Sequence, residues 1–323
     1  LASFLGANSD ILETTATYLR WLLLFSPAFI FNNIFLCFIR NDHSPRLPTV
    51  AMITGNLANI ILDYIFIFPM NMRMFGAVFA TGLSPVISIL CMLVHWIKKR
   101  NSFHLIKTKL DFKIIGQETV LGLPSLIIQL SSGIVIIIFN ILILDLQGNT
   151  GVAAYGVIAN ISLVTTSVYT GISQGTQPLI SSFFGEKNAQ SVKSVLKYSC
   201  LSALLISVFI YLIIYIWADP ITGIFNSEQN SMLQSISVRG LKLYFLSLLP
   251  SGINIILASY FSSVERSLPS NIITILKGFA LILPLVYILS FLFGMTGIWL
   301  ACPIAEFITA FIGCFIYRKT GSV

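Results

Sequence analysis

The chain has 323 residues, of which 56% are hydrophobic and 10% are charged, and its formal net charge is +7. Soluble domains usually carry about 25% charged residues, so this composition excludes an ordinary soluble enzyme or binding domain. Apolar runs of about 20 residues, the length that crosses a hydrocarbon core of about 30 Å, recur along almost the whole sequence. The runs are too long for barrel strands and lack their alternation. We therefore expect an all-α polytopic membrane protein.

Nine membrane-spanning helices are predicted in chain order. They lie at about 15–39, 48–69, 74–97, 118–144, 150–182, 192–218, 237–263, 269–291 and 296–317. When the loops are assigned alternately to the two sides, most of the 19 Lys and Arg residues fall on one side, which the positive-inside rule makes cytoplasmic. The C-terminus is then cytoplasmic. Because the basic residues are spread over separate loops, the positive charge reports topology, and we expect no nucleic-acid partner.

Cysteine and histidine give little sign of a metal or redox site. The five cysteines stand singly in or beside apolar runs, which disfavours a disulfide framework or a CxxC metal site. The three histidines, His43, His95 and His104, lie in or beside polar loops. We expect all three to be solvated loop residues.

An internal repeat accounts for the position of the longest loop, which separates three predicted spans from six. The segment from Pro48 to Ile87 aligns without gaps on the segment from Pro269 to Ile308, and the matches include the loop proline and a Gly-x-x-x-Ala pattern. Both copies run in the same direction, as a parallel repeat requires. We predict the remainder of an N-terminal lobe at 1–97, a cytoplasmic loop at 98–117 and a six-helix lobe at 118–323. Six helices per repeat would place three more before residue 1.

Asp63 and Glu306 are the two acidic residues that fall well inside predicted spans. An ionisable group at that depth costs about 2.5–3.5 kcal/mol on insertion scales, so it normally faces a bundle interior, a wet cavity or a partner. Asn56, Asn59 and Asp63 follow a helical spacing and share one face. Two amides and a carboxylate suit a monovalent cation or a proton. The alternative is a polar clamp between helices, although the repeat places Pro284 at the position of Asp63, so packing does not require the carboxylate.

Lys277 is the one basic residue that falls deep inside a predicted span, and it occupies the repeat position of Asn56. A pair between Lys277 and Glu306 would neutralise two costly charges. Both a structural pair and a substrate or proton site remain open. A second polar set lies in the fourth and fifth spans and is either a group of helix contacts or the wall of a solute cavity: Gln129, Asn140, Asn160, Gln174 and Gln177.

Enzyme motifs are absent from the sequence. It has no HExxH, GxSxG or Walker loop, so we expect a protein that is not an enzyme, needs no cofactor and draws any pumping energy from an ion gradient.

Several segments, in their order along the chain, resemble the multidrug and toxic compound extrusion (MATE) family, and the resemblance extends over essentially the whole chain. They are LGANSDILETTATYLRWLLLFSP, NIILDYIFIF followed by GAVFATGLSP, GVAAYGVIANI with SQGTQPLISSFFGEKNAQ, and YFLSLLPSGINIILASYF with GIWLACPIAE. The resemblance implies a twelve-helix fold of two six-helix lobes, alternating access, and export of amphipathic or cationic small molecules coupled to protons or sodium. Carried over residue by residue, the family's cation site in the first lobe falls on Asn59, Asp63 and Thr81, and sodium there is the one metal ion expected. The family's aspartate on its first helix has no counterpart in this sequence.

The resemblance further implies a monomer in the cell membrane, N-terminally truncated, with helices four to six of the first lobe and all six of the second. Two other functions remain open. A flippase for a lipid-linked or polysaccharide precursor would favour a strongly cationic cavity, whereas Lys277 is the one buried base. A non-transporting membrane scaffold would not need Asp63 or Glu306.

Overall fold

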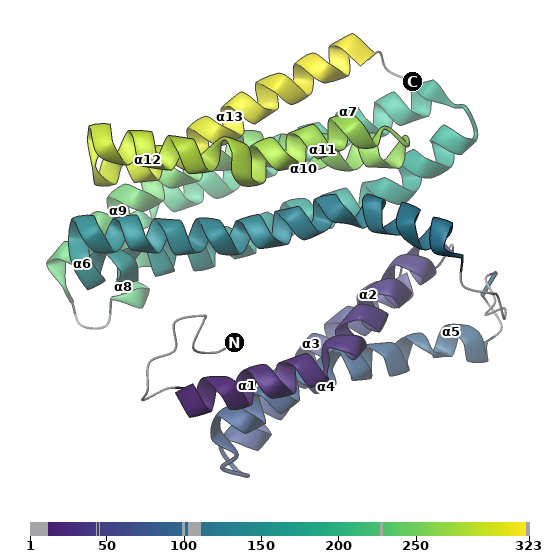
Figure 1. Cartoon of the computed structure of the whole chain (residues 1–323), viewed down its shortest axis with the longest axis horizontal. Helices are drawn as coiled ribbons and strands as arrows, with labels where there is room; N and C mark the ends of the chain where they lie inside the picture. Colours follow the sequence, from purple (N-terminus) through teal and green to yellow (C-terminus); the bar gives the residue numbers. More distant parts are fainter. Residues whose placement is uncertain are drawn as a thin grey trace. The chain divides into compact units, whose positions relative to one another are not determined.

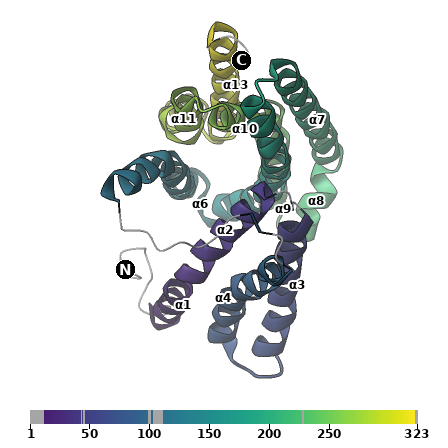
Figure 2. The ribbon, with the colours of Figure 1, turned by 90° about the vertical axis from the view of Figure 1, so that its right-hand side faces the viewer.

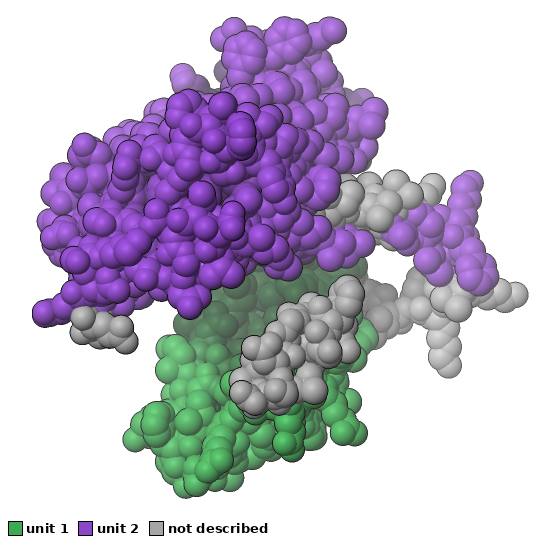
Figure 3. All heavy atoms as spheres, turned by 60° about the vertical axis from the view of Figure 1, so that its left-hand side comes forward, with its two compact units in different colours: residues 1–109 green, residues 110–323 purple. Residues whose placement is uncertain are grey.

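The computed structural model describes residues 12–42, 44, 46–98, 101–102, 111–226 and 229–320. They belong to two compact units, residues 1–109 (unit 1) and residues 110–323 (unit 2), which Figure 3 distinguishes by colour. The described residues form helices joined by short turns and contain no strand. The predicted all-α class is therefore confirmed.

The described residues of unit 1 form five helices (Figure 1). They are α1 (Leu12–Leu24), α2 (Ser26–Asn41), α3 (Arg46–Ile67), α4 (Arg73–Met92) and the short α5 (Val94–Ile97). α1 and α2 together form the first predicted span, bent by 43°. Pro27 stands in the first turn of α2, where a missing N–H costs no helical hydrogen bond. The proline thus begins a new helix after the bend.

Phe25 fixes this bend against α4. A Cβ atom built on Gly82 would lie 2.1 Å from Cδ2 of Phe25, so the ring occupies the space that any larger residue at position 82 would need. The same ring lies edge-on to Phe79, with 5.8 Å between ring centroids. The small residue on α4 therefore permits the close approach of the α1–α2 corner.

Unit 2 contains the remaining helices. They are α6 (Phe112–Gly185), α7 (Ala189–Ile216), α8 (Ala218–Phe225), α9 (Ser231–Tyr244), α10 (Leu248–Ser263), α11 (Ser267–Ile275), α12 (Ile282–Phe293) and α13 (Met295–Thr320). α10, α11 and α13 pack against one another, as Figure 2 shows. α6 packs against α7, α9 and α10.

α6 is two antiparallel helices joined at Gly148, whose φ of 62° and ψ of −159° are not helical. The rings of Phe139 and Tyr155 stack with centroids 5.3 Å apart. A continuous helix, rising 1.5 Å per residue, would separate them by about 24 Å. The two predicted spans in this region are therefore both present.

The start of α6 differs from the prediction. The helix begins at Phe112 and not at about 118, so residues 112–117 are helical and the predicted loop at 98–117 is shorter than expected. Asp111 caps this helix, its side chain accepting a hydrogen bond from the backbone N–H of Lys113 at 2.8 Å. The capping carboxylate allowed the helix to extend into a polar segment.

Two further spans are interrupted by irregular turns. A 3-10 turn, η1 (Phe245–Ser247), joins α9 to α10, and a π-helical turn, η2 (Leu276–Ala280), joins α11 to α12. In the described residues seven helices are long and apolar enough to cross a membrane, or eight with the bent α1–α2 pair. One of these, Gln129–Gly185, is divided at Gly148. Each of the nine predicted spans thus corresponds to a helix, a broken helix or one half of α6.

Two repeat-related glycines make the same kind of contact in the two units. A Cβ on Gly76 in α4 would lie 2.9 Å from Cβ of Phe66 in α3, and a Cβ on Gly297 in α13 would lie 1.8 Å from the carbonyl oxygen of Leu289 in α12. Each glycine lets a helix pack closely on the one before it. This agreement favours the internal repeat predicted from sequence.

Replacing Gly297 by alanine is expected to destabilise unit 2. The added methyl group would collide with backbone, which cannot move aside as a side chain can, and overpacking of this kind costs about 1–3 kcal/mol. Gly171→Ala is the matched control, because a Cβ there meets no described atom within 4 Å. Thermal unfolding of the purified variants in detergent measures the difference. Equal midpoints for the two variants would contradict the close approach of α12 and α13.

Candidate functional site

The carboxylate of Asp63 lies on α3 in unit 1 and is half-buried. Its Oδ1 atom is buried and has no hydrogen-bond partner among the described residues. The same holds for Nδ2 of Asn59, one helical turn earlier on the same face. Buried polar groups are normally paired. Two buried polar groups without a described partner on one helix face therefore make this face a candidate for binding a small polar ligand.

Thr81 on α4 presents an oxygen from the helix that packs against α3. Its hydroxyl donates a hydrogen bond to the carbonyl oxygen of Ala77 at 2.9 Å, which uses the hydroxyl's one proton and leaves its lone pairs free to accept. Asn56 completes the predicted face, and its side chain is exposed in unit 1. Asn59, Asp63 and Thr81 are thus partly buried, and Asn56 is not.

Asn32 on α2 is a polar residue that the sequence reading missed. Its Oδ1 atom is also buried without a hydrogen-bond partner in the described part of the chain, and α2 packs against both α3 and α4. A pair of asparagines, Asn32 and Asn33, inside an apolar helix was the available signal. Neutral amides in spans are common enough in helix contacts that the signal did not stand out.

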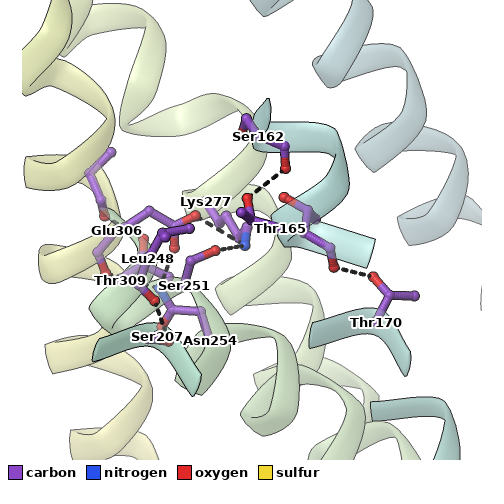
Figure 4. Close-up of polar contacts among 12 residues, drawn as sticks. Ser162, Thr165, Thr170, Ser207, Leu248, Ser251, Asn254, Lys277, Glu306 and Thr309 are labelled. Atoms are coloured by element: carbon purple, nitrogen blue, oxygen red, sulfur yellow. Dashed lines mark hydrogen bonds and ion pairs between the residues drawn. The ribbon is translucent and has the colours of Figure 1, made fainter. Parts of the chain in front are cut away.

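Lys277 and Glu306 form an ion pair, which is one of the two arrangements that the sequence left open. Nζ of Lys277 lies 3.0 Å from Oε1 of Glu306 and 2.9 Å from Oγ of Ser251. Nδ2 of Asn254 donates to Oε2 of Glu306 at 2.6 Å and to its backbone carbonyl at 2.9 Å. Figure 4 shows these side chains converging from α10, η2 and α13. Ser251 and Asn254 are neutral, and sequence reasoning did not single them out.

The ion pair is shielded unevenly from solvent. The side chain of Glu306 is 8% exposed and that of Lys277 is 27% exposed. Asn254 is fully buried, and its Oδ1 has no hydrogen-bond partner among the described residues. In the same unit, Oγ of Ser207 donates to the carbonyls of Ala203 and Leu248, and the hydroxyl of Tyr169 lies 2.8 Å from the same oxygen. Glu306, Asn254, Lys277 and Ser251 therefore form one polar network, in which the carboxylate is buried and the ammonium is partly exposed.

The second predicted polar set does not join this network. Gln129, Asn160 and Gln177 are exposed, and Asn140 and Gln174 are half-buried. The amide of Asn160 donates to the carbonyl of Gly156 in its own helix at 2.9 Å. No hydrogen bond between described residues links these five side chains to Lys277 or Glu306.

His95 is not the solvated loop residue that the sequence indicated. Its side chain is 1% exposed, and Nε2 lies 2.8 Å from Oδ2 of Asp42. The backbone N–H of Ser102 donates to Oδ2 of the same carboxylate at 3.0 Å, and the hydroxyl of Ser102 donates to its Oδ1. His43 and His104 lie outside the described residues. The correction follows from Asp42, a distant partner that a local reading of polarity could not supply.

These hydrogen bonds, first from His95 and then from Ser102, lower the pKa of Asp42 from its ordinary 3.8 to about 2. A lowered pKa means that the carboxylate stabilises the folded unit fully above pH 3.8 and loses that contribution as the pH falls through about 2.

Acid unfolding of the purified protein should therefore respond to Asp42. Wild type is expected to be more stable than Asp42→Asn at neutral pH, and this advantage is expected to shrink between about pH 4 and pH 2. Asp145→Asn, at an exposed position, is the control and should follow wild type. An advantage for wild type that is independent of pH would show that the charge of Asp42 is not what stabilises the contact.

The MatE family profile matches residues 1–65 and 124–288, which is more than half of the chain. The chain belongs to the MatE family. This membership confirms the resemblance found in the sequence, and it identifies the chain as a membrane transporter and not an enzyme.

Relatives and solved structures extend this likeness over nearly the whole chain. The multidrug export protein MepA of Staphylococcus aureus (strain MSSA476) is 27% identical over 318 residues, which cover 98% of this chain and 69% of MepA. MepA of Staphylococcus saprophyticus is 26% identical over the same shares. A MATE transporter in complex with MaL6 superposes with a TM-score of 0.89 at 24% identity, covering 98% of this chain and 71% of that one.

A third similar structure has a different description. It is a transporter of the MOP superfamily from Pyrococcus furiosus, whose binding pocket of reverse polarity is said to suggest a different function. It superposes with a TM-score of 0.89 at 23% identity and covers 98% of this chain and 71% of that one. At this identity the likeness establishes the fold alone.

Proposed function

We propose that the protein is a cation-coupled antiporter that exports amphipathic or cationic compounds across the cell membrane by alternating access, with a proton or sodium as the coupling ion. The observation that carries the proposal is the buried, unpartnered Oδ1 of Asp63. A carboxylate oxygen away from water is costly unless it is paired. A bound cation or proton supplies that pair.

The chemistry around Asp63 supports a cation over a polar clamp. In a clamp, a neighbouring helix would donate to Oδ1, and no described residue does. Asn59 and Thr81 add neutral groups: the hydroxyl oxygen of Thr81 has free lone pairs, and half a turn of the Asn59 amide would present its oxygen. One carboxylate with neutral oxygen ligands suits a monovalent cation or a proton.

The names of the relatives support the choice of exported compound. Proteins that match nearly the whole chain are described as multidrug export proteins, so the substrates proposed are drug-like small molecules. We also propose that the protein acts as a monomer, with its C-terminus cytoplasmic on the strength of the basic loops.

Lys277 weighs against the flippase alternative. A carrier of anionic lipid-linked precursors would favour a strongly cationic cavity, whereas the ammonium of Lys277 is neutralised by Glu306 at 3.0 Å. The paired base therefore offers little free positive charge to an anionic headgroup.

Efflux from proteoliposomes tests the proposal. The purified protein is reconstituted with a fluorescent cationic dye inside, and a pH gradient or a sodium gradient is imposed separately. Dye export driven by one of the two gradients is expected and would identify the coupling ion. Movement of a labelled polyprenyl-linked sugar without dye export would favour the flippase, and no transport under either gradient would favour a scaffold.

A further inference from the structure

The membrane-embedded carboxylates of the two units have different partners for their negative charge. In unit 1, Oδ1 of Asp63 is buried and unpartnered among the described residues. In unit 2, Oε1 of Glu306 is 3.0 Å from Nζ of Lys277, and Oε2 accepts from Asn254 at 2.6 Å. Among the described residues, no cationic side chain pairs with the first carboxylate, whereas Lys277 pairs with the second.

The ammonium of Lys277 sits in an environment of the kind that holds a free cation. It contacts a carboxylate oxygen of Glu306 and the hydroxyl oxygen of Ser251, and Figure 4 shows both contacts. Oxygen ligands with one negative charge are the ligands that hard cations prefer. Asn254 holds the second carboxylate oxygen in place. Lys277 thus occupies the position that a bound monovalent cation would take.

An irregular turn carries this lysine. Lys277 lies in the π-helical turn η2, in which the N–H of Leu281 bonds to the carbonyl of Leu276 at 3.2 Å. Such turns are rare and are frequently found at functional sites. Gly278 in the same turn lies against α6, where a Cβ would be 3.5 Å from Cβ of Ser131. The backbone thus departs from the α-helix at the residue that delivers the charge.

The repeat relates this lysine to the proposed cation site of unit 1. Lys277 aligns with Asn56 and Pro284 with Asp63. On the corresponding face, the second copy therefore has no carboxylate at the position of Asp63 and has a positive charge at the position of Asn56. The acidic partner comes instead from Glu306, on another helix.

We propose that Lys277 is a tethered counter-cation, which supplies to Glu306 by a covalent link the charge that an exchangeable cation supplies to Asp63. Unit 2 then exchanges no ion with the medium, and each transport cycle moves the ion bound in unit 1 alone. The inference rests on the proposed function for the role of Asp63. Its consequence in unit 2 does not: without the amine, Glu306, Ser251 and Asn254 become a site for a small free cation.

Thermal unfolding in different salts tests this consequence. All variants carry Asp63→Asn, so that any cation effect arises in unit 2. Lys277→Ala is compared with Lys277→Ala/Glu306→Gln in methylammonium, sodium or N-methylglucamine chloride. Mildly alkaline pH is used, so that protons compete weakly for the carboxylate.

Methylammonium or sodium is expected to raise the unfolding midpoint of Lys277→Ala by about 3 °C or more at saturation, and N-methylglucamine is not. The rise is expected to be absent when Lys277 is intact and when Glu306→Gln is added. No cation-specific rise in Lys277→Ala, or an equal rise in the double variant, would overturn the proposal. A failure of Asp63 to bind ions would leave this comparison unaffected.

A second measurement stays informative if Lys277→Ala does not fold. Radioactive sodium bound to the protein with Asp63 intact is counted by equilibrium dialysis and compared with Lys277→Met/Glu306→Gln, which removes both charges. Equal amounts of bound sodium are expected, because the native pair holds none. Loss of one bound ion per chain in the double variant would show that Glu306 is an exchangeable site and would overturn the proposal.

Discussion

Gradient-driven dye efflux is expected to fall to the level of protein-free vesicles when Asp63 is replaced by asparagine. The substitution keeps the size of the side chain and removes the charge that would attract the coupling cation. Because Oδ1 makes no hydrogen bond among the described residues, the variant breaks no described contact and is expected to fold. A neutral amide cannot alternate between a loaded and an unloaded state, so coupling is lost.

The control for this experiment is Asp145→Asn, which makes the same chemical change at an exposed position in α6. It is expected to retain efflux. Thermal unfolding of both variants shows whether loss of transport comes from misfolding. Unchanged efflux in a folded Asp63→Asn protein, under both the pH and the sodium gradient, would mean that Asp63 is a structural clamp.

Thr81 offers a milder test of the same site. Thr81→Val removes an oxygen ligand with little change in side-chain shape. It also removes the hydrogen bond that the Thr81 hydroxyl donates to the carbonyl of Ala77. The variant is expected to need a steeper gradient for the same efflux, and Thr81→Ser is expected to behave like wild type. Efflux of Thr81→Val equal to that of wild type would exclude this oxygen from the site.

The helical spans could be predicted from sequence because their signal is local. Apolar runs of the right length and basic loops are properties of the chain itself, and they located each span to within a few residues. The breaks inside the spans are set by tertiary contacts. The corner at Phe25 depends on the missing side chain of Gly82, which is distant in the sequence.

The site divides in the same way. A charge in a membrane span is conspicuous, so Asp63, Lys277 and Glu306 stood out. The last two lie 3.0 Å apart, as one of the two open alternatives required. Neutral groups such as Asn254 are common in spans, and burial and distant partners give them their role. His95 was misjudged for this reason: it adjoins a basic loop, yet the carboxylate of Asp42 makes its burial favourable.

Glu306→Gln is expected to destabilise the protein strongly and to be rescued by a second substitution. Removing one member of a buried ion pair leaves the other charge uncompensated, which costs about 3–5 kcal/mol, whereas replacing both members is often nearly neutral. Glu306→Gln and Lys277→Met are each expected to lower the unfolding midpoint, and the double variant is expected to recover most of the loss. Glu186→Gln, at an exposed position, is the control for the single change.

The size of the recovery distinguishes two accounts of the pair. A large recovery would mean that each charge is tolerated chiefly because the other neutralises it. The same double variant is then expected to bind as much sodium as wild type, because the native pair holds no sodium. Additive losses would mean that Lys277 and Glu306 act separately. Lys277 would in that case owe its stability to Ser251 alone, and Glu306 to Asn254, with each charge free to take a partner from solution.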